Sequence, residues 1–302
     1  MKIAPQHQTR AAATALVLAA LFWSGNFIAG RAIRDDIAPL ELNTIRWIIS
    51  LGVLLPFTFR GLITHRKALL QSWLKITLLG FTGVAAFHTM AYEALSLTAA
   101  VNCLLITALA PVATVAGGMV WNGFRPTAAQ FTGLLVSLVG AIVLILSGGG
   151  AGASLFAIDA GKVWMLGAVL IWAWYTLMLR SNPVNVPQTV SLVASIIVAL
   201  VMMLALLLVR GIEPPQMNRD MVLAILYIAI LPSALGFLLW SYGISVIGPE
   251  QGGQFIHLMP IFGSILAVLF LGESITLSLV AGAVCVITGI VLVNRRDKTL
   301  SS

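Results

Sequence analysis

Long, uninterrupted apolar runs dominate the chain, and short segments with charges, Gly, Pro or Asn separate them. Most runs are close to the roughly 20 residues that a helix needs to cross the hydrocarbon core of a bilayer. Their residues do not alternate between apolar and polar, as the strands of a membrane barrel would. The pattern predicts ten membrane-spanning helices, at about 12–30, 41–59, 73–95, 98–121, 128–147, 162–180, 187–209, 220–243, 249–271 and 277–293.

A Gly-rich linker, Ser147 to Asp159, lies at the middle of the chain and divides these helices into two groups of five. The two halves also resemble each other in sequence. Four landmarks of the first half recur in the second at a constant offset of 149, and a tyrosine recurs at an offset of 150; the pairs are Pro111 and Pro260, Gly123 and Gly272, Gly133 and Gly282, Gly140 and Gly289, and Tyr92 and Tyr242. We therefore expect a first repeat at 1–150 and a second at 151–302. Because each half holds an odd number of spans, the second enters the membrane inverted, as in many secondary transporters.

Composition narrows the function classes. Of the 302 residues, 60% are apolar and 9% are charged, which leaves no room for a sizeable water-exposed domain. This excludes a soluble enzyme and a nucleic-acid-binding domain. No metal-ligand spacing, HExxH motif, paired carboxylates or Ser-His-Asp set at a common depth occurs, so we expect no metal, no cofactor and no enzymatic activity.

The net charge of +7 is interpreted as an orientation signal. With the N-terminus inside, the loops of the inner side hold eleven Lys and Arg residues and those of the outer side five. This bias predicts a multi-pass protein of the bacterial inner membrane with both termini in the cytoplasm.

Polar side chains in hydrocarbon are costly, so the few within the spans indicate function. They gather in the first, third, fourth, sixth, eighth and ninth spans and predict a central, aromatic and weakly polar cavity. The candidate substrate-binding residues are Trp23, Asn26, His88, Tyr92, Asn102, Trp174, Tyr175, Trp240, Tyr242, Gln254 and His257.

Three prolines, Pro111, Pro232 and Pro260, lie near span centres. Each removes a backbone N–H and predicts a kink, so these residues are candidate hinges beside a cavity; the alternative is that proline is simply common in membrane helices. Small residues on one face of the fifth and tenth spans predict close helix packing, either within the chain or in a dimer. The expected oligomeric state is a monomer or a homodimer.

Several assignments stay open at this stage. A histidine at the depth of His88 or His257 is either a neutral packing residue or a ligand for substrate or protons. Arg46 and Glu41 are expected to extend to the outer surface. No Asp or Glu occupies a predicted membrane centre. Coupling through a deep carboxylate is therefore disfavoured, which leaves proton coupling through histidine or uncoupled export.

The ten spans, the inverted halves, the segments Tyr92 to Pro111 and Tyr242 to Pro260, and the FLGE at Phe270 to Glu273 resemble the drug/metabolite transporter superfamily, specifically its EamA-type exporters. The chain is most similar to the bacterial aromatic amino-acid exporters of the YddG type. The family's Leu-Gly-Glu motif is matched only in the second half. The resemblance implies a basket of ten helices around a central cavity and export of amino acids by alternating access.

Three hypotheses follow. The first is an exporter of aromatic and other apolar amino acids, because aromatic side chains offer stacking faces and polar edges to such a substrate. The second is an exporter of a different small metabolite or drug, although a carrier of cationic drugs should need a buried acid. The third, a membrane-embedded enzyme or receptor, is disfavoured by the repeat. The expected partners are a small-molecule substrate and the lipid bilayer.

Overall fold

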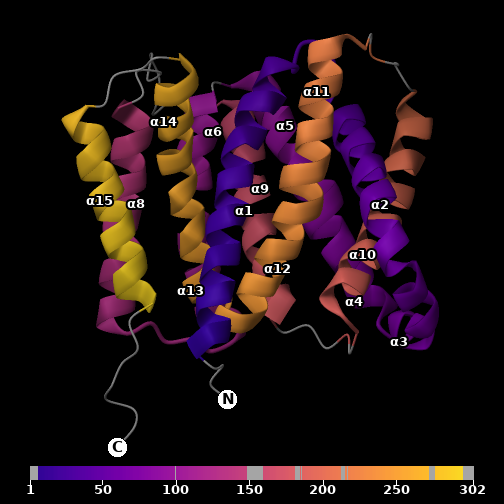
Figure 1. Ribbon diagram of the computed structural model, residues 1–302, viewed down its shortest axis with the longest axis horizontal. Helices are drawn as coiled ribbons and strands as arrows, with labels where there is room; N and C mark the ends of the chain where they lie inside the picture. The colour runs from indigo at the N-terminus through magenta and orange to yellow at the C-terminus, as the bar shows by residue number, and fades with distance from the viewer. Residues whose placement is uncertain are drawn as a thin grey trace, which may run out of the picture.

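The computed structural model describes residues 6–98, 100–147, 159–180, 184, 186–211, 215, 217–271 and 276–294. Within these residues the chain is helical and contains no strand (Figure 1). The elements of the first half are α1 (Gln6–Ala32), α2 (Pro39–Thr64), α3 (Arg66–Gln71), α4 (Trp73–Leu79), η1 (Gly80–Ala86), α5 (Phe87–Leu97), α6 (Ala100–Thr107), α7 (Ala110–Trp121) and α8 (Ala128–Ser147). Those of the second half are α9 (Ala160–Arg180), α10 (Gln188–Arg210), α11 (Arg219–Ile228), η2 (Ala229–Leu235), α12 (Gly236–Ile247), α13 (Pro249–Gly252), η3 (Gly253–His257), α14 (Leu258–Leu271) and α15 (Leu277–Asn294).

Nine helical segments of the described chain are long and apolar enough to cross a membrane. The remaining predicted span, the ninth (249–271), is also helical, but α13, η3 and α14 follow one another there, so a 3₁₀ stretch interrupts it. Large apolar side chains such as Phe57, Val120 and Leu208 are exposed on the outside of the bundle, as lipid contact requires. The all-α membrane fold is therefore confirmed. The start of α1 and the end of α15 lie at the same end of the bundle (Figure 1).

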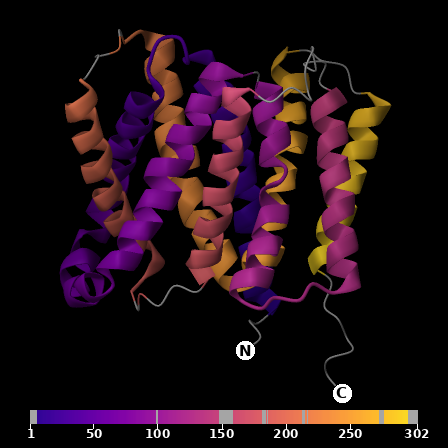
Figure 2. The same ribbon diagram turned by 180° about the vertical axis from the view of Figure 1, so that it is seen from behind.

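The two halves pack with an approximate two-fold symmetry. Helix α1 contacts α12 and α14 of the second half, and its counterpart α9 contacts α5 and α7 of the first half. The counterparts α2 and α10 pack against each other, as do α8 and α15. Figures 1 and 2 show α8 and α15 side by side at one edge and α2 and α10 at the other. The functional centre therefore has to be sought between these edges, where α1 and α9 lie.

The edge formed by α8 and α15 depends on glycine. A Cβ atom on Gly133 would lie 2.6 Å from the carbonyl oxygen of Gly289, and one on Gly140 would lie 2.7 Å from that of Gly282. These contacts pair each glycine with the repeat counterpart of the other one. The glycines of the small faces predicted in the fifth and tenth spans are thus used for packing within the chain.

Two π-helical segments interrupt the third and eighth spans at the same repeat position. The segment η1 covers Gly80–Ala86 and η2 covers Ala229–Leu235, an offset of 149. π-helical turns are rare in proteins overall, but many of those that occur lie at functional sites. In η2, Pro232 cannot donate to the carbonyl of Ile228, and the hydroxyl of Ser233 donates to that carbonyl instead, at 2.7 Å. In η1, the side-chain amide of Asn43 donates to the carbonyls of Val84 and Ala85. Side chains thus satisfy backbone groups that regular helix would pair.

Some sequence expectations lie outside the described residues. These are the expected repeat boundary at 150/151, most of the Gly-rich linker, and Gly272 and Glu273 of the FLGE motif.

Candidate functional site

An aromatic layer lies where the two repeats meet. Trp23 of α1 and Trp172 of α9 are repeat counterparts at the offset of 149, and their rings meet edge to face with centroids 5.1 Å apart. Trp240 packs on both rings, at 5.0 and 5.5 Å. Phe237 lies 5.8 Å from both. The indole N–H of Trp23 donates to the carbonyl of Pro232 at 2.9 Å, so this ring is fixed to η2.

A cavity adjoins this layer on the side of residues 26–27 of α1. Its walls come from both repeats: Trp23, Asn26, Phe27, Phe87, His88, Thr107, Ala110, Val169, Trp172, Ile256 and Met259. They include three counterpart pairs at the offset of 149, so the cavity lies close to the approximate symmetry axis. The space open to the centre of a water molecule is about 30 Å³, which admits water but not a whole amino acid. In the described conformation the cavity is therefore too small to hold such a molecule.

Two polar atoms of the cavity residues lack hydrogen-bond partners within the described residues. They are Nδ1 of His88 and Nε1 of Trp172, and both are buried. A buried polar group without a partner is costly, and a water or a ligand that reached these atoms would relieve that cost.

A buried arginine adjoins the cavity wall. Arg46 of α2 has no exposed surface, so the expectation that it extends to the outer surface is wrong. Its Nε donates to Ser233 Oγ at 2.7 Å, and its Nη1 donates to the hydroxyl of Tyr92 at 2.6 Å and to Asn26 Oδ1 at 3.4 Å. Tyr92 in turn donates to Asn26 Oδ1 at 3.0 Å. Hydrogen bonding to η2, α5 and α1 therefore holds the guanidinium inside the protein, where snorkelling would have left it in water.

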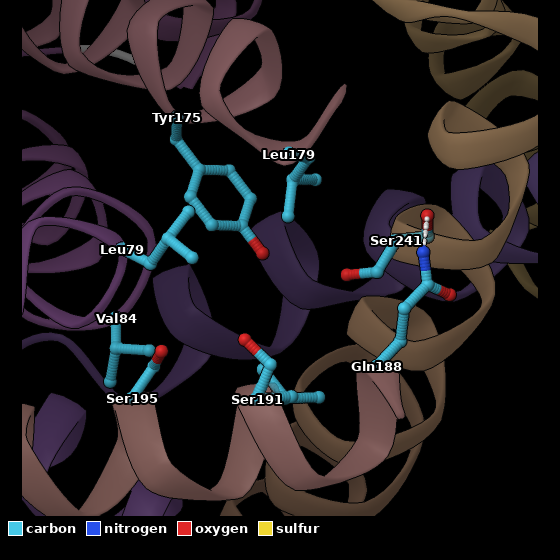
Figure 3. A pocket seen from close by; sticks show the side chains of 9 residues that line it. Leu79, Val84, Tyr175, Leu179, Gln188, Ser191, Ser195 and Ser241 are labelled. Carbon is cyan, nitrogen blue, oxygen red and sulfur yellow. Dashed lines mark hydrogen bonds between the residues drawn. The ribbon is translucent and has the colours of Figure 1, made fainter. Parts of the chain in front are cut away.

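The counterpart region of the second repeat has no cation. Ser195 occupies the position of Arg46, Tyr175 that of Asn26, and Ser241 that of Tyr92. These three residues line a second cavity, again of about 30 Å³, with Ser191 and Gln188. Figure 3 shows the hydroxyls of Tyr175, Ser191 and Ser241 pointing into it. Along α9, Val169 of the first cavity and Tyr175 of the second lie on opposite sides of Trp172, so the aromatic layer separates the two.

His257 and Gln254 hold helices together. Nε2 of His257 donates to the carbonyl of Ala108 at 2.9 Å, since a carbonyl can only accept. Its Nδ1 therefore accepts from the hydroxyl of Ser137 at 2.8 Å, and Gln254 Oε1 lies 3.2 Å from the same hydroxyl oxygen. Both ring nitrogens of His257 are thus occupied by protein groups.

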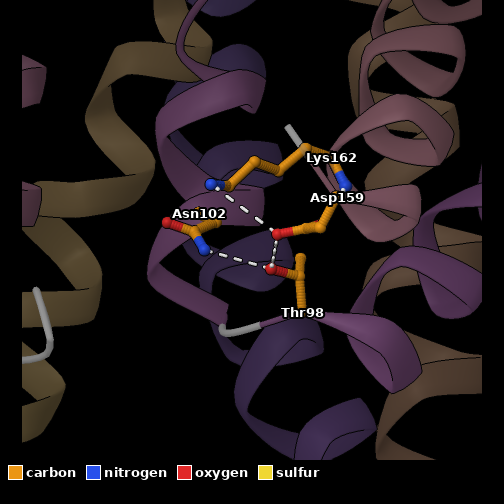
Figure 4. Close-up of polar contacts among 4 residues, drawn as sticks. All are labelled: Thr98, Asn102, Asp159 and Lys162. Atoms are coloured by element: carbon orange, nitrogen blue, oxygen red, sulfur yellow. Dashed lines mark hydrogen bonds and ion pairs between the residues drawn. The ribbon is translucent and has the colours of Figure 1, made fainter. Parts of the chain in front are cut away.

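Seven of the eleven candidate residues line neither of these two cavities. Four of them, Tyr92, Trp240, Gln254 and His257, make the contacts described above, and the other three are Asn102, Trp174 and Tyr242. Asn102 donates to Thr98 Oγ1 at the start of α6, where Thr98 also contacts Asp159 (Figure 4). Trp174 packs against Trp121, with ring centroids 6.0 Å apart, and Tyr242 is 37% exposed. The last two lie two residues beyond Trp172 and Trp240, which turns them about 200° around their helices.

The three candidate hinge prolines all lie at irregular segments. Pro111 follows the break between α6 and α7, Pro232 lies inside η2, and Pro260 follows η3 near the start of α14. The described helices therefore depart from regular α geometry at each predicted kink.

Arg46, Trp172 and Phe237 are missing from the sequence-based set. Trp172 could have been found, because the offset of 149 leads to it directly from Trp23. The only sequence signal for Arg46 was its position near the end of a span. That position is equally typical of a residue that extends its charge to the membrane surface.

Comparisons with known proteins agree with this architecture. The model of the EamA-like transporter family matches the chain twice, at residues 10–146 and 159–295, so the second match begins 149 residues after the first. A "Probable terminal-alkyne amino-acid exporter" of Streptantibioticus cattleyicolor is 28% identical over 283 residues, which cover 93% of each chain. An "Uncharacterized transporter" of Archaeoglobus fulgidus is 24% identical over 285 residues, covering 93% of this chain and 96% of that protein.

The fold also matches a known crystal structure with a TM-score of 0.74 at 20% identity, over 93% of this chain and 95% of the other. The two family matches confirm the two-repeat fold inferred from the offset. They also indicate a membrane transporter for a small-molecule substrate. The chain belongs to the EamA-like transporter family.

Proposed function

We propose that this transporter exports amino acids, chiefly aromatic and other apolar ones, by alternating access. The observation that carries the proposal is the cavity between the repeats, which is walled by Trp23, Phe87 and Trp172 and edged by the polar groups of Asn26 and His88. Aromatic walls favour a ring or an apolar side chain, and the polar groups suit the charged end of an amino acid. The name of the Streptantibioticus relative supports the same substrate class.

In this proposal the candidate residues have different roles. Trp23, Asn26 and His88 contact the substrate directly, while Tyr92 and Trp240 hold these contacts from behind. Tyr175 receives the substrate in the second cavity. Gln254 and His257 keep α8 and η3 together.

The two cavities on opposite sides of the aromatic layer are the proposed basis of alternating access. Each is too small to hold an amino acid in the described conformation, so transport requires helices to move. We assign the bending of the helices to the irregular segments at Pro111, Pro232 and Pro260. Backbone that lacks regular helical hydrogen bonds bends with a smaller cost in free energy. The exchange of the two repeats' conformations would then open one cavity as the other closes.

We further propose that the protein lies in the bacterial inner membrane with both termini in the cytoplasm. The end of the bundle at which α1 starts carries Arg10, Arg60, Arg66, Lys67 and Lys75. The excess of basic residues on that side supports the orientation. In this orientation the first cavity, beside Arg46, faces outward and the second cavity, with Tyr175, faces inward.

The first test is uptake of radiolabelled phenylalanine, tryptophan and threonine into liposomes that contain the purified protein, with and without a pH gradient. Saturable uptake of the two aromatic amino acids is expected. Protein-free liposomes and the His88→Gln variant serve as controls. Absence of uptake with folded protein would contradict the proposal and favour a different small metabolite or drug as cargo.

A further inference from the structure

The guanidinium of Arg46 is a buried cation whose charge lacks a counterion among the described residues. Ion pairs in that part of the chain join Arg34 to Asp35, Lys162 to Asp159 and Arg180 to Glu250, and none involves Arg46. The groups that accept its hydrogen bonds are an amide and two hydroxyls. The rings of Trp47 and Tyr92, at 5.4 and 5.7 Å, contribute cation–π contacts. These neutral groups reduce the cost of burial but do not neutralise the charge.

The hydrogen-bond donors of Arg46 are incompletely used. A guanidinium carries five N–H donors. The Nε donor is bonded to Ser233, and the two of Nη1 are directed to Tyr92 and Asn26, but Nη2 has no partner among the described residues. The Nη1 contact with Asn26 is long, at 3.4 Å. The side of the guanidinium formed by Nη1 and Nη2 thus has one donor in a long hydrogen bond and two donors without a partner. Such a side can form hydrogen bonds with the two oxygens of a carboxylate.

Asn26 connects this edge with the first cavity. Its side chain is part of the cavity wall, and its Oδ1 is the weakly bound acceptor of Nη1. Rotation of the Asn26 amide would expose the guanidinium to the cavity. A substrate carboxylate that enters there would replace the distant neutral acceptor, Asn26 Oδ1, with a charged one. The aromatic ring of the same substrate would remain against Trp23 and Trp172. His88, on the same wall, lies in ring contact with Tyr92 at 6.2 Å.

The second repeat offers no equivalent. Ser195 replaces Arg46, and its hydroxyl also lacks a partner in the described residues. None of the described residues that line the second cavity is a cation, whereas Arg46 adjoins the wall of the first. This difference is not explained by the fold, since the second repeat packs without such a cation.

We propose that Arg46 is the anchor for the carboxylate group of the transported molecule. This inference rests on the proposed function, which it deepens by specifying that the substrate is bound as an apolar or aromatic carboxylate with its acid group at Arg46. Asn26 is then the gate between the guanidinium and the cavity.

The test uses three related ligands on the purified full-length protein in detergent. Phenylalanine has both charged groups, 3-phenylpropionate has only the carboxylate, and phenylalaninamide lacks it. Binding is measured by isothermal titration for the wild type, Arg46→Gln, Arg46→Lys and the control Arg60→Gln, which makes the same change at an exposed arginine near the end of α2. In the wild type and the control, phenylalanine is expected to bind at least about tenfold more tightly than its amide, as a charge-assisted bond allows. Arg46→Gln should abolish this preference for phenylalanine over its amide. Arg46→Lys should retain part of it, because Lys keeps the charge but not the fork.

The outcomes separate this inference from the proposed function. If the wild type binds the amide as tightly as the acid, or Arg46→Gln keeps the preference, Arg46 is not the anchor, even when phenylalanine is exported normally. If 3-phenylpropionate binds in an Arg46-dependent manner but phenylalanine is neither bound nor exported, the anchor holds and amino-acid export is wrong. Should Arg46→Gln fail to fold, the wild-type ligand series and Arg46→Lys still decide the question.

Discussion

Trp23 and Trp172 occupy the same position in the two repeats and meet edge to face at the centre of the protein, 5.1 Å between ring centroids. Trp23 of the first repeat also packs against Trp240 and Phe237 of the second repeat, as Trp172 does. The layer that closes the space between the two cavities is therefore made jointly by both repeats, and any movement of one repeat against the other has to rearrange it.

Replacing Trp23 should impair both stability and transport. Trp23→Ala removes a buried ring and its hydrogen bond to Pro232, and truncations of this kind cost about 3–5 kcal/mol. Trp23→Phe keeps a ring and should lose about 1 kcal/mol with the hydrogen bond. Thermal unfolding in detergent and liposome uptake measure the two effects. Trp121→Ala, at a position that is 64% exposed, should behave like the wild type; equal losses in both alanine variants would contradict the central role of the layer.

The glycine contacts between α8 and α15 predict a strong sensitivity to one methyl group. The Cβ of Gly289→Ala would lie 2.5 Å from the backbone oxygen of Gly133 and the backbone nitrogen of Ser137, so the helices must separate, at a cost of about 1–3 kcal/mol. Gly263→Ala in α14 is the matched control, because its Cβ would meet no atom within 4 Å. That change should be neutral or stabilise the helix by up to about 1 kcal/mol. Equal melting temperatures for the two variants would refute the packing argument.

Asp159 predicts an acid-sensitive contribution to stability at the start of α9. Its carboxylate accepts from the backbone N–H of Lys162 at 2.8 Å. It also accepts from the hydroxyl of Thr98 at 3.1 Å (Figure 4). The first of these bonds is the main reason that the pKa of Asp159 lies below its ordinary value. A lowered folded-state pKa gives stability that is present above the unfolded value, about 3.9, and is lost as the pH falls through the folded value.

The measurement is thermal unfolding in detergent between pH 3 and pH 6, values chosen to bracket that titration. The advantage of the wild type over Asp159→Asn should be full at the upper end and should shrink below about pH 4. Asn caps helices about as well as Asp, so the variant isolates the charge. A wild-type advantage that stays constant over this range would contradict the assignment.

The two deep histidines should respond differently to substitution. Both nitrogens of His257 are bonded to protein groups, so His257→Gln should lower the melting temperature but leave any effect of a pH gradient on uptake intact. His88 has an unpartnered Nδ1 and lines the cavity, so His88→Gln should reduce uptake at nearly unchanged stability. Uptake into liposomes with and without a gradient tests both. Loss of the gradient response in His257→Gln alone would reverse the two assignments.

Much of the fold follows from the sequence because hydrocarbon imposes helices and sets their length. The predicted span 128–147 coincides with α8, and 249–271 covers α13 to α14 without indicating the 3₁₀ stretch between them. The π-helices could not be predicted, since they depend on side chains from other spans, such as Asn43, to accommodate their carbonyls.

The site was predicted less well, for reasons of geometry. Trp240 and Tyr242 share a depth and a span, but helical phase turns one inward and the other to the outside. Membership of a polar span therefore does not make a residue part of the cavity. The match of Tyr92 with Tyr242 at an offset of 150 was also misleading, because the offset of 149 pairs Tyr92 with Ser241.

The two sides of the aromatic layer differ chemically, because a guanidinium lies at Arg46 and a serine hydroxyl at Ser195. This difference has a kinetic consequence. A substrate that approaches from one face meets a different binding environment from one that approaches from the other, so half-saturating concentrations measured for entry and for exit should differ. Without an energy source, detailed balance still requires equal concentrations on both sides at equilibrium. The unequal repeats therefore make the carrier saturate at a lower substrate concentration on one side of the membrane than on the other. Accumulation of the substrate depends entirely on the gradient that drives transport.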